Sequence, residues 1–271
     1  MSPRLSRILF GTAVLVWSGV MLYFYASGRI NKYLAPDFRL LSMLGGLGLG
    51  VLGLFNILTS GANTTCGHDH GPGEDHHHDH QSSDLHPLVA LVLMLVPIGL
   101  STAWTKDEYS PAALARKGAY DSPSENVFLA SALPPLTRES VEQNHIKSPA
   151  GYYQFSLMEL FFATGDRDYQ SVIDGMKIET EGRLIDEKNN NSNGTRRRLY
   201  RLFITCCVAD SRAIPIIAEF NAPPPDIPEN DWVRISGTMT YPKENGELHP
   251  VLQVEDISPA DPPYEESFLR N

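Results

Sequence analysis

The sequence of 271 residues has few cysteines and none of the short motifs that mark the common enzyme classes. Its three cysteines are too few for a disulfide framework, so they do not indicate a redox compartment. It lacks a nucleophile elbow, a phosphate-binding loop, a dinucleotide-binding fingerprint and a His-Glu-x-x-His helix. With no positive indication of catalysis, we expect a non-enzymatic protein.

Basic residues are also scarce relative to acidic ones. Lys and Arg number 22 against 32 Asp and Glu, which gives a formal net charge of −10. Seventeen of the basic and twenty-six of the acidic residues follow Thr105, so the C-terminal part is polar and acidic. Because phosphates select a basic face, nucleic acid is not expected as a partner.

Charge is absent altogether from three stretches, residues 8–27, 40–60 and 87–105. A helix that crosses a hydrocarbon core of about 30 Å needs about 20 apolar residues. We therefore predict three transmembrane helices within residues 1–105, the third being shorter and containing Pro97 and Gly99. The alternative for the first stretch is a cleaved signal peptide, but the stretch is long for one and its end is a poor cleavage site.

The second stretch contains glycines spaced for one face of a helix. Gly46, Gly50 and Gly53 follow the i, i+4, i+7 pattern. A face of small residues lets another helix approach closely. Two interpretations remain open: the face packs on the chain's own helices, or it docks a partner protein.

The loop over residues 61–86 contains seven of the nine histidines, one cysteine and five carboxylates. Imidazole and thiolate are ligands that zinc, copper, nickel and cobalt prefer. We predict that it binds divalent transition metal ions, with Zn(II) as the default, rather than being only a solvated polar loop. The candidate ligands are Cys66, His68, His70, His76, His77, His78, His80 and His86.

Beyond the third stretch, residues 106–150 are rich in Ala, Ser and Pro and predict a linker. Residues 152–164 have a helical period that ends at Gly165. The period then becomes two, which predicts strands over residues 176–186, 199–208, 213–220, 232–241 and 251–257. Five short strands favour a small all-β domain over residues 151–271, a barrel of the oligonucleotide/oligosaccharide-binding (OB) type.

Two adjacent cysteines lie on the second predicted strand, where neighbours point to opposite faces. Cys206 would share the apolar face and fill the core. Cys207 would lie on the more polar face, where it and Asp210 could form half of a metal site, with His249 as a further ligand. The alternative is that Cys207 is structural and Asp210 caps the turn.

The order of several short motifs resembles the YcgQ-like family of bacterial membrane proteins. They are Ala26-Ser27-Gly28 with Lys32-Tyr33, Cys66-Gly67-His68-Asp69-His70, Cys207-Val208-Ala209-Asp210, and the segment from Trp232 to Gly237. The resemblance implies a multi-pass plasma (inner) membrane protein working beside a separate multi-spanning permease, with divalent metal as substrate. It also implies an extracytoplasmic C-terminal domain. Cys206 and Ser211-Arg212 depart from the family pattern.

The side of the membrane is left open, because the positive-inside rule favours a cytoplasmic C-terminal domain instead. We expect a non-enzymatic accessory subunit of a membrane permease that handles a divalent metal ion such as zinc through the histidine loop. The alternatives are a stand-alone membrane metal buffer or sensor, and a thiol-redox membrane protein that uses Cys207.

Overall fold

The computed structural model describes residues 3–61, 87–104, 109–121 and 136–269. The chain divides into two compact units. The first comprises Met1–Asn31 and Pro36–Asp107, and the second comprises Lys32–Ala35 and Glu108–Asn271. The second unit therefore includes a four-residue segment that lies, in sequence, between the first two helices.

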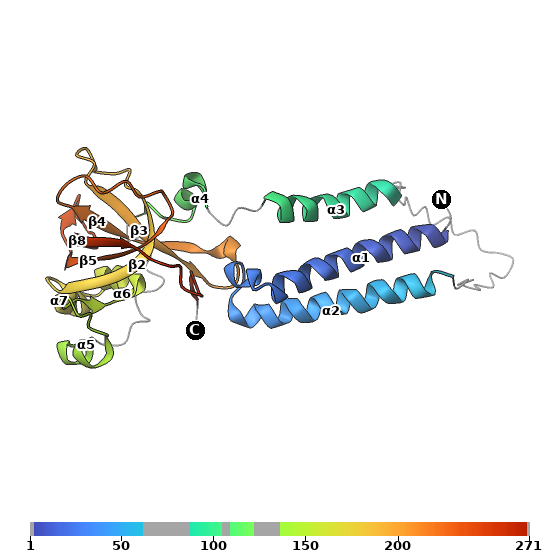
Figure 1. The fold of residues 1–271 in the computed structure, drawn as a ribbon, viewed down its shortest axis with the longest axis horizontal. Helices are drawn as coiled ribbons and strands as arrows, with labels where there is room; N and C mark the ends of the chain where they lie inside the picture. Colours follow the sequence, from blue (N-terminus) through green and yellow to red (C-terminus); the bar gives the residue numbers. More distant parts are fainter. Residues whose placement is uncertain (1–2, 62–86, 105–108, 122–135, 270–271) are drawn as a thin grey trace, which may run out of the picture. The chain divides into compact units, whose positions relative to one another are not determined.

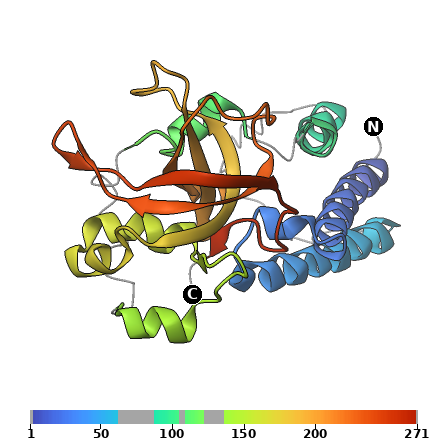
Figure 2. The ribbon, with the colours of Figure 1, turned by 60° about the vertical axis from the view of Figure 1, so that its left-hand side comes forward.

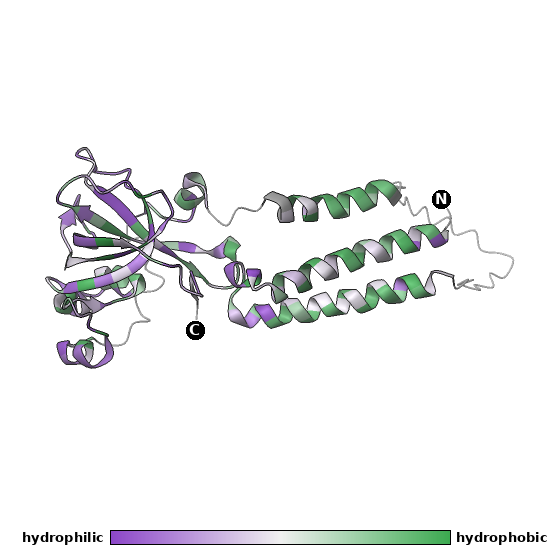
Figure 3. Ribbon diagram, in the orientation of Figure 1, coloured by the Kyte–Doolittle hydropathy of each residue, from purple (hydrophilic) through white to green (hydrophobic). Residues whose placement is uncertain are grey.

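The first unit is helical. It contains α1 (Pro3–Ala26), α2 (Pro36–Leu58) and α3 (Pro87–Trp104), with the short 3-10 helices η1 (Arg29–Lys32) and η2 (Thr59–Gly61). Helices α1 and α2 run side by side in opposite directions (Figure 1). All three helices are apolar along most of their length (Figure 3).

Two helices are long and apolar enough to cross a membrane, Arg4–Ala26 and Pro36–Gly61. Of the most apolar part of each helix, only 17% and 11% is buried within the described structure. The third predicted stretch does form a helix, α3, but its apolar part, Leu88–Leu100, is shorter. The prediction of three spans is thus corrected to two helices whose length and composition are compatible with a membrane span.

The glycine face of α2 packs on α1. A Cβ atom added to Gly50 would lie 2.9 Å from Ser18 Oγ, and one added to Gly53 would lie 2.9 Å from Leu15 Cγ. The Ser18 hydroxyl also donates a hydrogen bond of 2.7 Å to the carbonyl of Gly46. Of the two interpretations left open by the sequence, the structure favours packing within the chain, because α1 occupies this face.

The second unit is a mixed sheet with short helices. Its helices are α4 (Pro111–Arg116), α5 (Arg138–Asn144), α6 (Leu157–Phe162), η5 (Ala163–Gly165), α7 (Arg167–Ile173) and η6 (Val208–Asp210). Its strands are β1 (Tyr153–Gln154), β2 (Lys177–Asp186), β3 (Arg196–Ile204), β4 (Arg212–Phe220), β5 (Trp232–Thr240), β6 (Lys243–Glu244), β7 (Glu247–Leu248), β8 (Val251–Pro259) and β9 (Phe268–Leu269).

The strand order is β1-β2-β5-β8-β4-β3-β9, and β2 also pairs with β3. β6 and β7 form a separate hairpin. Strand β8 runs antiparallel to β5 but parallel to β4, and the sheet is strongly curved (Figure 2). The predicted β-rich domain is therefore confirmed as a mixed sheet, and the five predicted strands correspond to β2, β3, β4, β5 and β8.

The larger differences from the predictions concern β3, α6 and the predicted linker. Strand β3 ends at Ile204, four residues earlier than predicted. The helix predicted from residue 152 begins only after Ser156, which caps α6 in a capping box with Glu159. Residues 106–150, predicted as a linker, contain α4 and α5, and these bury Leu114 and Val141 completely.

The sheet packs apolar side chains on both of its faces. One cluster joins α6 and α7 to residues such as Leu199 and Phe203 of β3. The other joins Leu114 of α4 to residues such as Tyr200 and Leu202 of the same strand. Since both faces of β3 are buried, the simple apolar/polar alternation read from the sequence does not hold there.

Candidate functional site

A turn at the end of β3 brings together three side chains that could bind a metal ion. The two Sγ atoms of Cys206 and Cys207 and a carboxylate oxygen of Asp210 all lie within 4.8 Å of one another. Across the ranges that the structure describes, this is the one group of three or more His, Cys, Asp or Glu side chains with such spacing.

The carboxylate of Asp210 organises the turn. Its Oδ2 accepts a hydrogen bond of 2.9 Å from the Cys206 N–H, and its Oδ1 accepts one of 3.2 Å from the Cys207 N–H. These two N–H groups therefore leave the strand ladder, which is why β3 stops at Ile204. Asp210 thus caps the turn, and the same contacts hold its charge beside both thiols.

The strand pattern predicted that Cys206 fills the core, and this prediction is wrong. Both thiols are half-buried. Because β3 ends two residues earlier, the alternation that would direct Cys206 inward does not extend to it. The sequence signal for this was Asp210 itself, a turn-capping residue placed four positions after Cys206.

The other proposed ligand, His249, is not part of the group. It follows β7 and lies near Glu244, whose pKa is lowered mainly by its hydrogen bond from Arg196. The site that the structure assembles therefore contains Cys207 and Asp210, as proposed from the sequence, with Cys206 in place of His249.

Hydrogen bonding sets the protonation of the group. Hydrogen bonds to Asp210 and to Cys207 raise the pKa of the Cys206 thiol to about 11. Partial burial alone would raise the pKa of Asp210, but hydrogen bonds from the Cys206 thiol and from backbone N–H groups outweigh it and lower that pKa. At neutral pH the resting group is a protonated Cys206 thiol on an ionised carboxylate, so a metal ion must displace the thiol proton to bind.

Lys117 places a cation beside this turn. Its Nζ donates a hydrogen bond of 2.8 Å to the carbonyl of Val208 and lies 5.5 Å from the centre of the Tyr109 ring. Burial lowers the pKa of Lys117, and the nearby Asp210 and Cys207 oppose that shift. The site therefore combines two thiols, one carboxylate and one ammonium group.

The segment between α1 and α2 pairs with the same turn. The Val208 N–H donates to the Tyr33 carbonyl at 2.8 Å, and the Ala35 N–H donates to the Cys206 carbonyl at 3.1 Å. Leu34 and Cys207 form an antiparallel bridge. The backbone that carries both thiols is therefore held on one edge by residues about 170 positions earlier in the chain.

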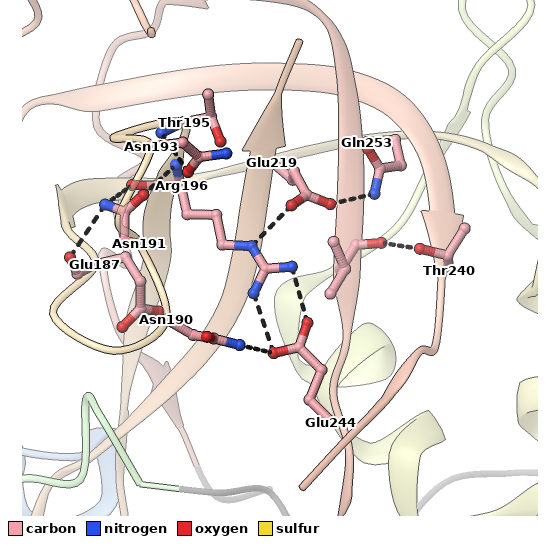
Figure 4. A network of polar contacts seen from close by, with 11 residues as sticks. Glu187, Asn190, Asn191, Asn193, Thr195, Arg196, Glu219, Thr240, Glu244 and Gln253 are labelled. Atoms are coloured by element: carbon pink, nitrogen blue, oxygen red, sulfur yellow. Dashed lines mark hydrogen bonds and ion pairs between the residues drawn. The ribbon is translucent and has the colours of Figure 1, made fainter. Parts of the chain in front are cut away.

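A second polar network, centred on Arg196, is structural (Figure 4). Arg196 donates to Glu219 from Nε and to Glu244 from both terminal nitrogens, at distances of 2.8 to 3.1 Å. Asn190 also donates to Glu244, and Gln253 donates to Glu219. Because these groups satisfy one another, the network ties the β2–β3 turn and the β6–β7 hairpin to the sheet.

The predicted ligands of the histidine loop, from Cys66 to His86, lie outside the described residues. Their metal binding stays a prediction.

Comparison with known proteins gives matches to two related family models. The model described as the DUF1980 N-terminal domain matches residues 9–107, and the DUF1980 C-terminal domain matches residues 164–267. No curated protein matches the chain. Among solved structures, a DUF3299 family protein from Pseudomonas aeruginosa aligns with 33% of this chain at 11% identity and a TM-score of 0.24. The alignment spans 64% of that protein, less than two thirds of its length.

Proposed function

The chain belongs to the DUF1980 family, and from this premise we propose that it is a non-enzymatic accessory subunit of a membrane permease that handles a divalent transition metal ion. The observation that carries the proposal is the group of two thiols and one carboxylate at Cys206, Cys207 and Asp210. These ligand types suit transition metals, with Zn(II) as the default. The seven histidines of residues 61–86 support the same cargo.

The pairing of Tyr33–Ala35 with residues 206–208 supports a specific membrane topology. The two paired segments must lie on the same side of the membrane. The C-terminal domain therefore lies on the side of the membrane that faces the start of α2.

Because α2 is long and apolar enough to cross the membrane, this topology places the histidine loop, which follows α2, on the opposite side from the thiol group. One metal-binding segment would then lie on each side of the membrane, an arrangement that suits a protein assisting passage of the ion. The permease resemblance puts the C-terminal domain outside the cell, and the positive-inside rule puts it in the cytoplasm. Labelling single-cysteine variants in intact cells with a membrane-impermeant reagent distinguishes these two orientations. Opposite accessibility of residues 34 and 226, a loop position of the domain, would contradict the topology.

The strand pairings also support the closed OB-type barrel predicted from the strand count. β2 pairs with β5, β5 with β8, β8 with β4, β4 with β3, and β3 with β2. A ring of five strands has this order of neighbours. In our proposal this domain is the rigid support for the thiol turn and the surface for a partner.

The proposed function is tested by measuring the metal content of cells that lack the gene. We expect a change in cellular zinc that wild-type protein reverses and the double variant Cys207→Ser/Asp210→Asn does not. A tagged wild-type chain, isolated from membranes in mild detergent, should retain a multi-spanning membrane protein. Unchanged levels of every transition metal in the deletion strain would refute a role in metal handling.

Experiment can separate the two alternative functions, a stand-alone metal buffer or sensor and a thiol-redox protein. A stand-alone metal buffer or sensor would change metal content without a retained membrane partner. A thiol-redox protein is favoured by the adjacency of the two thiols. However, the raised pKa of Cys206 opposes it, because the thiolate is the reactive form. Rapid exchange of Cys207 with glutathione disulfide, faster than with a free cysteine, would support the redox function instead.

A further inference from the structure

The chemistry of the turn restricts which cations it can hold. Two of its three potential ligands are thiols, and both oxygens of Asp210 already accept backbone hydrogen bonds. The carboxylate therefore has only part of its capacity left for an ion. Oxygen-preferring cations such as Mg(II), Ca(II) and Mn(II) need six or more oxygen ligands, whereas zinc-like ions take thiolates.

Lys117 strengthens this restriction through charge. Its backbone is fixed, because its N–H caps α4 and its carbonyl accepts a hydrogen bond of 2.8 Å from the Ala213 N–H. Its ammonium group donates to the carbonyl of Val208, within the same turn as the thiols. A cation that entered the group would therefore meet a fixed positive charge.

The charge balance separates two kinds of cation. A divalent ion held by the carboxylate alone adds two positive charges beside Lys117. A divalent ion bound by both sulfurs as thiolates has its two positive charges balanced by them, so it adds no net charge beside Lys117. Only the second kind avoids repulsion by the ammonium group.

We infer that Cys206, Cys207 and Asp210 form a site for one thiophilic divalent cation, and that Lys117 is a specificity-determining residue that disfavours oxygen-preferring cations. The inference rests on the proposed function only for the class of cargo. It assigns Cys206, which the strand pattern placed in the core, as a metal ligand. It also separates this site from the histidine loop, whose imidazoles take the same metals without thiol chemistry.

Cadmium binding to the purified full-length protein tests the site. We use a Cys66→Ser background in mild detergent and follow the ultraviolet charge-transfer band of cadmium thiolate, which histidine ligands do not produce. We expect the band to form with proton release. We expect it to lose at least half of its intensity in Cys206→Ser and in Cys207→Ser, with unchanged circular dichroism. A full band in Cys206→Ser, or no band in the background protein, overturns the site.

Competition by Mn(II) tests the role of Lys117. Removing the ammonium group in Lys117→Met should lower the Mn(II) concentration that displaces half of the cadmium about fivefold. This is the effect of one screened charge interaction of about 1 kcal/mol. The matched control is Lys243→Met, which removes an exposed lysine from β6 and should leave competition unchanged. Equal competition in both variants overturns the assignment of Lys117. Because no permease is present, a failure here leaves the cellular test of the proposed function standing.

Discussion

The contact between α1 and α2 gives the sharpest test of the helical unit. The perturbation is Gly53→Ala, a single methyl group on the face that α1 covers. That methyl would lie 2.9 Å from Leu15 Cγ and 3.0 Å from the carbonyl oxygen of Gly11, distances at which the helices must move apart. The matched control is Gly48→Ala on the same helix, where an added methyl meets nothing within 4 Å.

The expected magnitude follows from comparing the two substitutions. Both replace glycine by alanine inside α2, so the gain in helix propensity, up to about 1 kcal/mol in water, is common to both. Only Gly53→Ala also overpacks the contact, at a typical cost of about 1–3 kcal/mol. The difference between the two variants should therefore be about 1–3 kcal/mol, with Gly53→Ala the less stable.

The measurement is reversible unfolding of the full-length protein in mixed detergent micelles, followed by loss of helical circular dichroism. We expect Gly48→Ala to unfold at or above the wild-type midpoint and Gly53→Ala clearly below it. Gly50→Ala, which would meet Ser18 Oγ at 2.9 Å, should fall between them because a side chain can rotate away. If Gly53→Ala is as stable as Gly48→Ala, α1 does not pack on this face, and docking of a partner protein is again the better interpretation.

The remaining predictions concern the second unit. Arg196→Lys should lower its stability by about 1–3 kcal/mol in thermal unfolding, because lysine cannot replace the paired hydrogen bonds to Glu244. Bonding to Arg196 lowers the pKa of both Glu219 and Glu244 below the ordinary 4.5, although burial alone would raise that of Glu219. The contribution of these two carboxylates to the stability of the folded state should be complete above pH 4.5 and should be lost as the pH falls through their lowered pKa values. This pH-dependent contribution should be smaller in Arg196→Lys. Iodoacetamide should label Cys207 before Cys206 at neutral pH, and raising the pH toward about 11 should bring Cys206 into reaction. Earlier labelling of Cys206 would show that Asp210 does not hold that thiol protonated.

Local patterns in the sequence predicted most of the secondary structure. The two long uncharged stretches form α1 and α2, because spanning length and apolarity depend only on neighbouring residues. The five strands were also identified from local patterns, with ends within a few residues, although both faces of β3 are buried. The start of α6 was missed even though its cap, Ser156 with Glu159, is itself a local signal.

The candidate site was predicted only in part. Cys207 and Asp210 were identified because a thiol and a carboxylate three residues apart can share a turn. Cys206 was assigned to the core because the predicted strand extends past Ile204, whereas the alternation of faces ends where β3 ends. Lys117 gave no signal, since it lies in a stretch that reads as a linker.

The apolar helices, the strands and the spacing of two thiols and one carboxylate within five residues can be read from the sequence, because each depends on residues close together in the chain. Three features are visible only in the folded protein: α1 covers the glycines of α2, Lys117 lies against the thiol turn, and Tyr33–Ala35 pairs with that turn. These are contacts between distant residues, and they are chosen by packing and hydrogen-bond satisfaction across the whole unit, for which local periodicity carries no information.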